Sequence, residues 1–269
     1  MARGRFIVVD GLDGCGKGVI IDTLVEEAIK EGKKVFNVDQ FWGKKTNKYP
    51  ILSKLLGYVG LKVPSWEKVI GFHPDPKKII GKYDVIVTSE PTFVGIGAVV
   101  RDDLIAKNGI TYSPEAVADG YALDRRILYE QLLLPILEAG IDVYQSRSLS
   151  TSIVYQRQMA LDLGRDFSME EILQLPGNAF CYEHPMDFLV IPTIKDVSEV
   201  MRRLECREKD DDCEFENLEF QLKLKKQYDS PDFREVFKRK GVELVSMDVG
   251  GTLEHSIEQA REFYHRELK

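Results

Sequence analysis

The stretch Gly11-Leu12-Asp13-Gly14-Cys15-Gly16-Lys17-Gly18 decides the fold of this chain, because its glycines and lysine have the spacing of a Walker A loop. An apolar run at 6–10 precedes it, and a helical pattern follows it. Glycines let the backbone wrap closely around phosphate oxygens, and N–H groups at the start of a helix donate to an anion. The strand–loop–helix order therefore predicts a nucleotide site rather than a plain turn, built by Gly11, Leu12, Asp13, Gly14, Cys15, Gly16, Lys17, Gly18 and Val19.

The end of this loop departs from the motif. The Walker A lysine is normally followed by Ser or Thr, whose hydroxyl binds Mg²⁺. Gly18 occupies that position here, and Val19 comes next. Since Mg²⁺ keeps several water ligands in many sites, we expect Glu90 or Asp13 to reach it through water, and the metal ligands stay open.

A chain of 269 residues with 43% apolar residues can form one large α/β domain or two small ones with a sizeable core, and we expect a single domain over residues 1–269. No apolar run approaches the roughly 20 residues that span a bilayer, and no signal-peptide pattern begins the chain. We therefore expect a cytoplasmic protein without membrane contact. The net charge of −7 argues against a general nucleic-acid surface.

Short β-rich runs alternate with helical patterns, which predicts a parallel sheet covered by helices on both faces. The helix that starts at Ser113-Pro114 is expected to run to Glu138 with a kink at Pro135. The predicted strands are Phe6–Asp10, Val35–Val38, Asp84–Thr88, Ile141–Tyr144, Asp187–Ile191 and Val242–Ser246.

Two segments interrupt this rhythm. Residues 41–82 are predicted to form an insertion. The stretch 43–82 contains nine lysines and only two acidic residues, which gives it a local charge of +7. With Trp42 and Trp66 it suits nucleic-acid stacking, although a structural appendage explains it as well. Residues 207–216 are highly charged and are predicted to be a lid.

Four further motifs follow the loop in order: Thr88-Ser89-Glu90-Pro91, Tyr121-Ala122-Leu123-Asp124-Arg125, Arg147 followed by Tyr155-Gln156, and Arg203-x-x-x-Arg207. In this order and spacing the series resembles the thymidylate kinase family. The resemblance implies a three-layer α/β/α P-loop kinase fold with a five-stranded parallel sheet and a helical lid. It also implies ATP and Mg²⁺ as cofactors, dTMP as the acceptor and a homodimer.

The resemblance assigns roles by position. Lys17, Arg147 and Arg207 correspond to the catalytic cations, and Arg203 and Arg207 to the lid. The residues that correspond to the family's acceptor-binding positions, from the 3′-hydroxyl and phosphate to the base, are Asp13, Glu90, Tyr121, Arg125, Arg147, Tyr155 and Gln156. Plain structural alternatives stay open: Tyr121 as core, and Arg125 or Arg126 as surface charges paired with Glu130.

Several motif positions differ from the family pattern. Ser146 replaces the Asp before Arg147, Ser89 replaces an Arg, and Cys213 stands where the lid carries an Arg. The leading hypothesis is phosphorylation of a nucleoside monophosphate, with conversion of dTMP to dTDP the best candidate. A catalytically degenerate nucleotide-binding regulator and a P-loop kinase for another acceptor are the alternatives.

Overall fold

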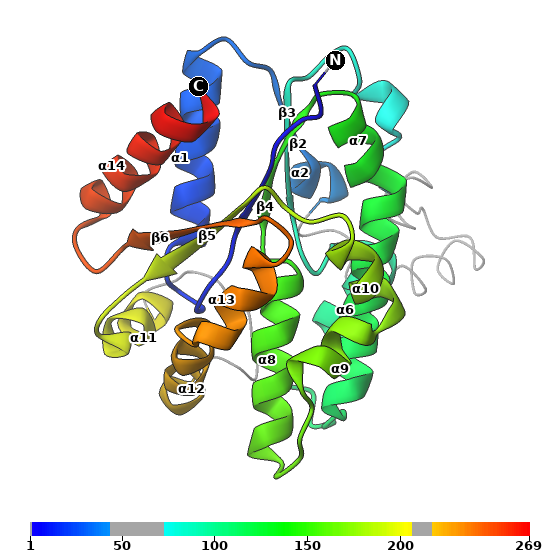
Figure 1. Cartoon of the computed structure of the whole chain (residues 1–269), viewed down its shortest axis with the longest axis vertical. Helices are drawn as coiled ribbons and strands as arrows, with labels where there is room; N and C mark the ends of the chain where they lie inside the picture. The colour runs from blue at the N-terminus through cyan, green and yellow to red at the C-terminus, as the bar shows by residue number, and fades with distance from the viewer. Residues whose placement is uncertain (1, 44–72, 206–216) are drawn as a thin grey trace, which may run out of the picture.

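The structure is a computed structural model that describes residues 2–43, 73–205 and 217–269. Most of the basic insertion and the lid segment 207–216 lie outside these described residues. In the described part a parallel sheet has the strand order β2-β3-β4-β1-β5-β6 (Figure 1). The sheet has six strands among the described residues rather than the five that the family resemblance implied, because the run near residue 243 adds an edge strand beside β5.

All six predicted runs form strands, with bounds shifted by a few residues. The central strand β1 pairs with β4 on one side and β5 on the other, and each of its four side chains is fully buried. Strands buried on both faces read as continuous apolar runs, which is why this segment shows no alternation. The strands are β1 Phe6–Val9, β2 Val35–Asn37, β3 Val85–Ser89, β4 Asp142–Ser146, β5 Phe188–Thr193 and β6 Glu243–Asp248.

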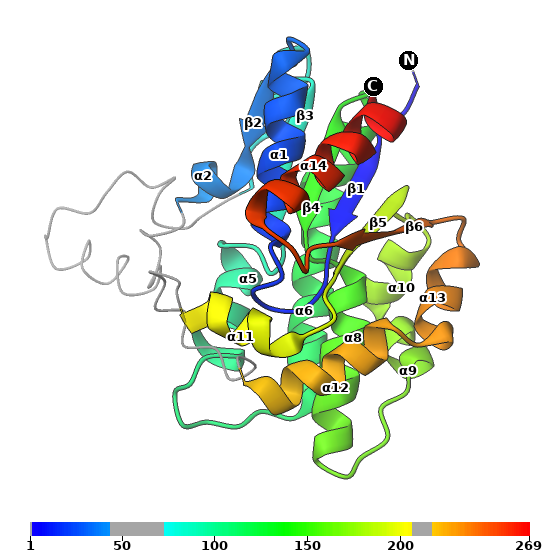
Figure 2. The same cartoon turned by 90° about the vertical axis from the view of Figure 1, so that its left-hand side faces the viewer.

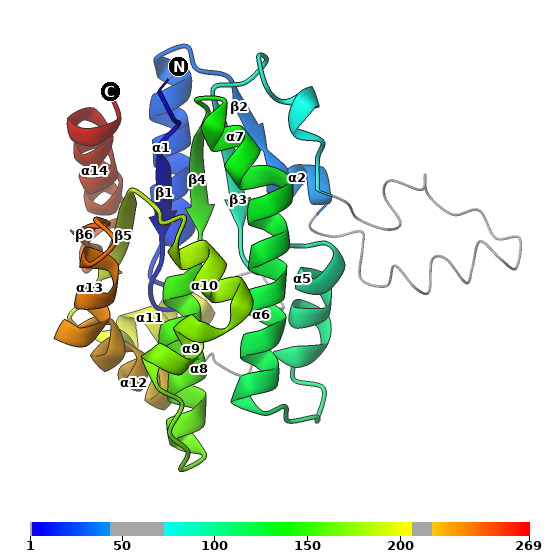
Figure 3. The same cartoon turned by 45° about the vertical axis from the view of Figure 1, so that its right-hand side comes forward.

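Helices cover both faces of the sheet. Figure 3 shows α1 and α14 on one face and α6 and α7 on the other, and Figure 2 shows α1 beside α14. The helices are α1 Lys17–Lys30, α2 Val38–Trp42, α5 Gly95–Val99, α6 Pro114–Leu128, α7 Leu134–Glu138, α8 Leu149–Asp162, α9 Met169–Gln174, α10 Pro176–Tyr182, α11 Val197–Glu205, α12 Leu218–Tyr228, α13 Pro231–Lys238 and α14 Leu253–Phe263. Short non-α turns are η1 Pro76–Lys78, η2 Val100–Leu104, η3 Tyr129–Leu133 and η4 Tyr264–Leu268.

The helix expected from Ser113 to Glu138 begins as predicted. The Ser113 side chain accepts a hydrogen bond from Ala116 N, and Pro114 occupies the first turn, where a missing N–H costs nothing. The helix is interrupted by the π-turn η3, which ends just before Pro135. A π-turn is a common way to accommodate a break in the α-helical hydrogen-bond ladder, so the irregularity falls one turn earlier than expected.

The start of the basic insertion is packed into the protein. Trp42 is only 3% exposed, and its ring centroid lies 5.4 Å from that of His73 and 6.4 Å from that of Phe93. Trp42 is therefore not presented for stacking on a nucleic-acid base, and Trp66 lies outside the described residues. Among the helices of the described ranges, none has the length and apolar character needed to cross a bilayer.

Candidate active site

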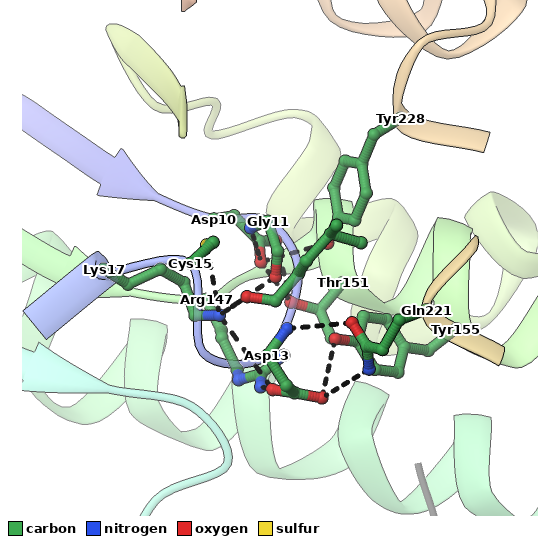
Figure 4. A network of polar contacts seen from close by, with 11 residues as sticks. Asp10, Gly11, Asp13, Cys15, Lys17, Arg147, Thr151, Tyr155, Gln221 and Tyr228 are labelled. Atoms are coloured by element: carbon green, nitrogen blue, oxygen red, sulfur yellow. Dashed lines mark hydrogen bonds and ion pairs between the residues drawn. The ribbon is translucent and has the colours of Figure 1, made fainter. Parts of the chain in front are cut away.

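The phosphate loop joins β1 to α1 at the carboxyl end of the central strand. Gly14 and Gly16 have φ values of 76° and 86°, a left-handed conformation that favours glycine. The Lys17 ammonium donates hydrogen bonds to the carbonyls of Gly11, at 2.9 Å, and Leu12, at 2.6 Å (Figure 4). The lysine thus lies over its own loop, where its charge and the N-terminus of α1 both favour an anion.

Asp13 is the centre of the polar network around this loop. The Arg147 guanidinium donates to Asp13 Oδ1, and the Tyr155 hydroxyl lies 3.0 Å from Asp13 Oδ2 (Figure 4). Gln221 of α12 donates to the same Oδ2 at 3.3 Å and accepts from the Asp13 backbone N–H at 3.1 Å. Lys17 Nζ lies 4.0 Å from Asp13 Oδ1, so two cations lie beside the same carboxylate oxygen.

Arg147 is held in an unusual backbone conformation directly after β4. Its φ is 65°, and Arg147 is the one non-glycine residue with a positive φ among the described residues. Its N–H donates to Val9 O at 3.0 Å, and Gln145 Nε2 donates to its carbonyl at 2.9 Å. The guanidinium carbon lies 5.3 Å from the centre of the Tyr155 ring. These contacts direct the side chain toward the phosphate loop, and such strain is characteristic of functional sites.

A second carboxylate, Asp10, directly follows β1 and was missed by sequence reasoning. It accepts hydrogen bonds from the Gly11 N–H at 2.8 Å, from the Thr151 hydroxyl at 2.7 Å and from the Tyr228 hydroxyl at 3.2 Å, and also from Ser150. Its side chain is fully buried. A carboxylate at the end of a buried strand is unusual, and this was the available signal.

Glu90 and Arg125 form a buried ion pair beneath the site. Arg125 Nε lies 2.8 Å from Glu90 Oε2, and Gln145 Nε2 donates to Glu90 Oε1 at 2.9 Å. Arg125 also donates to Ser152, at 3.0 Å, and to Asn178. Burial raises the pKa of the Glu90 carboxyl to about 7, against the opposing effect of the Arg125 charge.

Comparisons with known proteins identify the family of this chain. The model of the family described as thymidylate kinase matches residues 78–239. A probable thymidylate kinase from Pyrococcus abyssi is 32% identical over 187 residues, which cover 65% of this chain and 83% of the relative. The chain belongs to the thymidylate kinase family.

Other relatives match more partially. A thymidylate kinase from Thermoanaerobacter sp. (strain X514) is 27% identical over 154 residues, 57% of this chain, and the chain spans about half the length of that relative, 51%. The solved thymidylate kinase from Candida albicans is 18% identical, with a TM-score of 0.56 over 99% of this chain and 93% of that structure. This likeness supports the three-layer α/β fold alone.

Within the thymidylate kinase framework, the remaining predicted residues fall in different environments. Tyr121 is 5% exposed and packs with Val100 and Val117 in a small apolar cluster. Gln156 is fully buried, and among the described residues neither its amide oxygen nor its nitrogen has a hydrogen-bond partner. Buried polar groups are normally hydrogen-bonded, so this amide is an exception. Arg125 is in the core, whereas Arg126 makes the exposed pair with Glu130.

The described lid arginine does not reach the phosphate loop. Arg203 Nε lies 3.0 Å from Glu199, and its Nη2 donates to the carbonyls of Val249, at 3.0 Å, and Gly251, at 3.4 Å. This side chain joins α11 to the loop that follows β6. Arg207, the other predicted lid residue, lies outside the described residues.

The side chains of this site are not arranged to bind Mg²⁺ directly. No side chain extends from Gly18, and within the described ranges no three His, Cys, Asp or Glu side chains converge on a metal position. The carboxylates of Asp10, Asp13 and Glu90 are each engaged by several protein donors. Direct ligation of Mg²⁺ would displace these donors, so we assign no catalytic step to a metal.

Proposed function

We propose that this chain catalyses ATP-dependent phosphorylation of a nucleoside monophosphate, with dTMP as the acceptor. The observation that carries the proposal is the position of two cations, Lys17 and Arg147, beside the same carboxylate oxygen, Asp13 Oδ1. Ligands of α/β proteins bind at the carboxyl ends of the strands, which is where β1 and β4 deliver these groups. Lys17 and the loop N–H groups would hold the ATP phosphates, and Arg147 would hold the acceptor phosphate.

This reaction demands little acid–base chemistry from the protein. The second pKa of a phosphate monoester is about 6, so the acceptor is mostly dianionic near neutral pH and needs no strong base. Catalysis is then positioning and charge neutralisation. A planar guanidinium binds a phosphate through two parallel hydrogen bonds, a geometry that a lysine cannot supply.

We assign binding of the acceptor base to side chains of α6 and α8. The Gln156 amide carries a donor and an acceptor that have no partner in the part of the chain that the structure describes, and a nucleobase edge offers both complements. Tyr121 and Tyr155 would supply aromatic faces along the acceptor. Arg125 is engaged by Glu90, Asn178 and Ser152, and we assign it to holding this pocket in shape.

The test is an ADP-release assay with a panel of nucleoside monophosphates, each with and without Mg²⁺. Turnover with dTMP above the ATP-only background supports the proposal. Turnover only on a different monophosphate would replace dTMP as the acceptor. One observation favours that alternative: Ser89 stands where the family pattern has an arginine, and its hydroxyl donates to Asp39 at 2.9 Å. A homodimer, which the family implies, is tested separately by light scattering.

A second candidate function is nucleotide binding without chemistry. The engaged carboxylates and Gly18 favour it, because the usual metal-ordering groups are unavailable. A calorimetric titration separates it from the kinase. ATP binding without turnover on any monophosphate would identify a regulator, whereas binding accompanied by turnover would exclude that function.

A further inference from the structure

Gln221 makes a reciprocal pair of hydrogen bonds with a single residue of the phosphate loop. Its amide oxygen accepts from Asp13 N at 3.1 Å, and its amide nitrogen donates to Asp13 Oδ2 at 3.3 Å (Figure 4). The Gln221 side chain is fully buried in α12. Gln221 therefore fixes both the backbone N–H and the carboxylate of Asp13.

The neighbouring loop residue abuts the helix before α12. A Cβ placed on Gly14 would lie 2.8 Å from Leu204 Cγ and 2.9 Å from the Val200 carbonyl oxygen, both in α11. No side chain larger than hydrogen fits there without displacing backbone. Residues 13 and 14 are therefore held between α11 and α12, which also contact each other.

We propose that Gln221 is a positioning residue that fixes the phosphate loop for nucleotide binding through Asp13, an inference that rests on the proposed function. The Asp13 carboxylate is attracted by Arg147 and, at 4.0 Å, by Lys17. Gln221 holds Oδ2 on the opposite side and fixes the adjacent N–H. Without it the carboxylate shifts toward the cations, and the loop carbonyls that hold Lys17 move with it.

The first experiment compares two glutamines of the same helix. Gln221→Leu removes both contacts with the loop, while Gln227→Leu removes an equivalent pair with Arg157, at 3.1 Å, and Gln158, at 3.3 Å, away from the loop. We expect Gln221→Leu to raise the Kd for ATP about 10-fold, the effect of one or two hydrogen bonds. Gln227→Leu should leave the Kd within about twofold of the wild type, because its contacts lie away from the loop.

The second experiment uses pH to distinguish positioning from packing. In Gln221→Glu the new carboxyl faces Asp13, so burial and like charge raise its pKa. When protonated, it can again donate to Asp13 and accept from its N–H. The ATP affinity relative to the wild type should therefore be lowest at pH 8 and recover at pH 5.5. This variant also decides the matter if Gln221→Leu does not fold.

The possible results distinguish a failure of this inference from a failure of the proposed function. An unchanged Kd in Gln221→Leu, or a pH-independent ratio in Gln221→Glu, overturns the inference while the wild type still binds ATP. A wild type that ignores ATP overturns the proposed function and the positioning role with it. A loss of affinity in Gln227→Leu equal to that in Gln221→Leu would also overturn the inference, because it would mark a general effect of α12 packing.

Discussion

Arg125 Nε lies 2.8 Å from Glu90 Oε2, and the two side chains are 0% and 2% exposed. The next residue along α6, Arg126, makes an ion pair of the same length with Glu130, but there both side chains are more than 40% exposed. One helix thus carries two ion pairs of equal geometry in opposite environments. Desolvation makes a buried charge costly once its partner is removed, whereas an exposed pair is screened by water.

Loss of the buried arginine should therefore be far more destabilising than loss of its neighbour. At pH 8, where Glu90 is mostly ionised, we expect Arg125→Met to reduce the free energy of unfolding by about 3–5 kcal/mol, since it leaves the Glu90 carboxylate buried without its cation. The matched control Arg126→Met should cost less than about 1 kcal/mol. Urea unfolding measures both, and adding Glu90→Gln to Arg125→Met should recover part of the loss. Equal losses from the two arginines would contradict this account.

Glu90 should make stability depend on pH near neutrality. Its pKa is about 7 in the folded protein against 4.5 for an ordinary glutamate, so between these values the folded chain holds a proton that the unfolded chain has released. The contribution is fully present below pH 4.5 and lost as the pH rises through 7. Relative to Glu90→Gln, the wild type should lose on the order of 2 kcal/mol between pH 5 and pH 8. Urea titrations at both values test it, and a constant difference would rule it out.

A hydroxyl at position 18 should strengthen the dependence of ATP affinity on Mg²⁺. Gly18 lies in α1, and a Cβ added there meets nothing within 4 Å, so Gly18→Ser is free of strain. We expect the ratio of ATP affinities with and without Mg²⁺ to rise in Gly18→Ser. The control Gly18→Ala adds the same Cβ without the hydroxyl and should leave the ratio unchanged. A similar ratio in all three proteins would show that the missing hydroxyl is immaterial.

Substitutions at Arg147 should separate its charge from its backbone. Both Arg147→Ala and Arg147→Gly remove the guanidinium, so both should raise the acceptor KM with little change in ATP affinity. Only glycine relieves the φ of 65°, so Arg147→Gly should be more stable than Arg147→Ala by about 1 kcal/mol. Steady-state kinetics and thermal unfolding provide the two readouts. An acceptor KM like that of the wild type in both variants would remove Arg147 from the site.

Lys17 should dominate nucleotide affinity. Its ammonium is the charge that lies over the loop, 2.6 Å from the Leu12 carbonyl. Lys17→Ala should weaken ATP binding by about 10- to 100-fold, the range for hydrogen bonds to charged groups. Lys30→Ala, at the other end of α1 and paired with Glu27, serves as the control and should bind normally. Calorimetry distinguishes them, and equal affinity in Lys17→Ala and the wild type would refute the predicted role.

Sequence patterns located the parts of this protein whose signal is local. The strand before the loop, the glycines with left-handed φ and the helix start at Ser113 each depend on residues within a few positions. The alternation of strands and helices, which predicts a parallel sheet, is also read from local sequence patterns. The family motifs placed Asp13 and Arg147 in one site by analogy, and the structure brings them into contact.

Tertiary structure alone decided which polar groups meet. Asp13 and Gln221 are 208 positions apart, and Asp10 accepts from Tyr228 across 218 positions, so no local spacing connects them. It also decided that Arg125 is buried while Arg126 is exposed, because helix rotation against α8 and α10 sets which of two adjacent side chains faces the core. The chain fixes the backbone elements through short-range propensity and hydrophobic periodicity, while the environment of each charge depends on packing between distant segments.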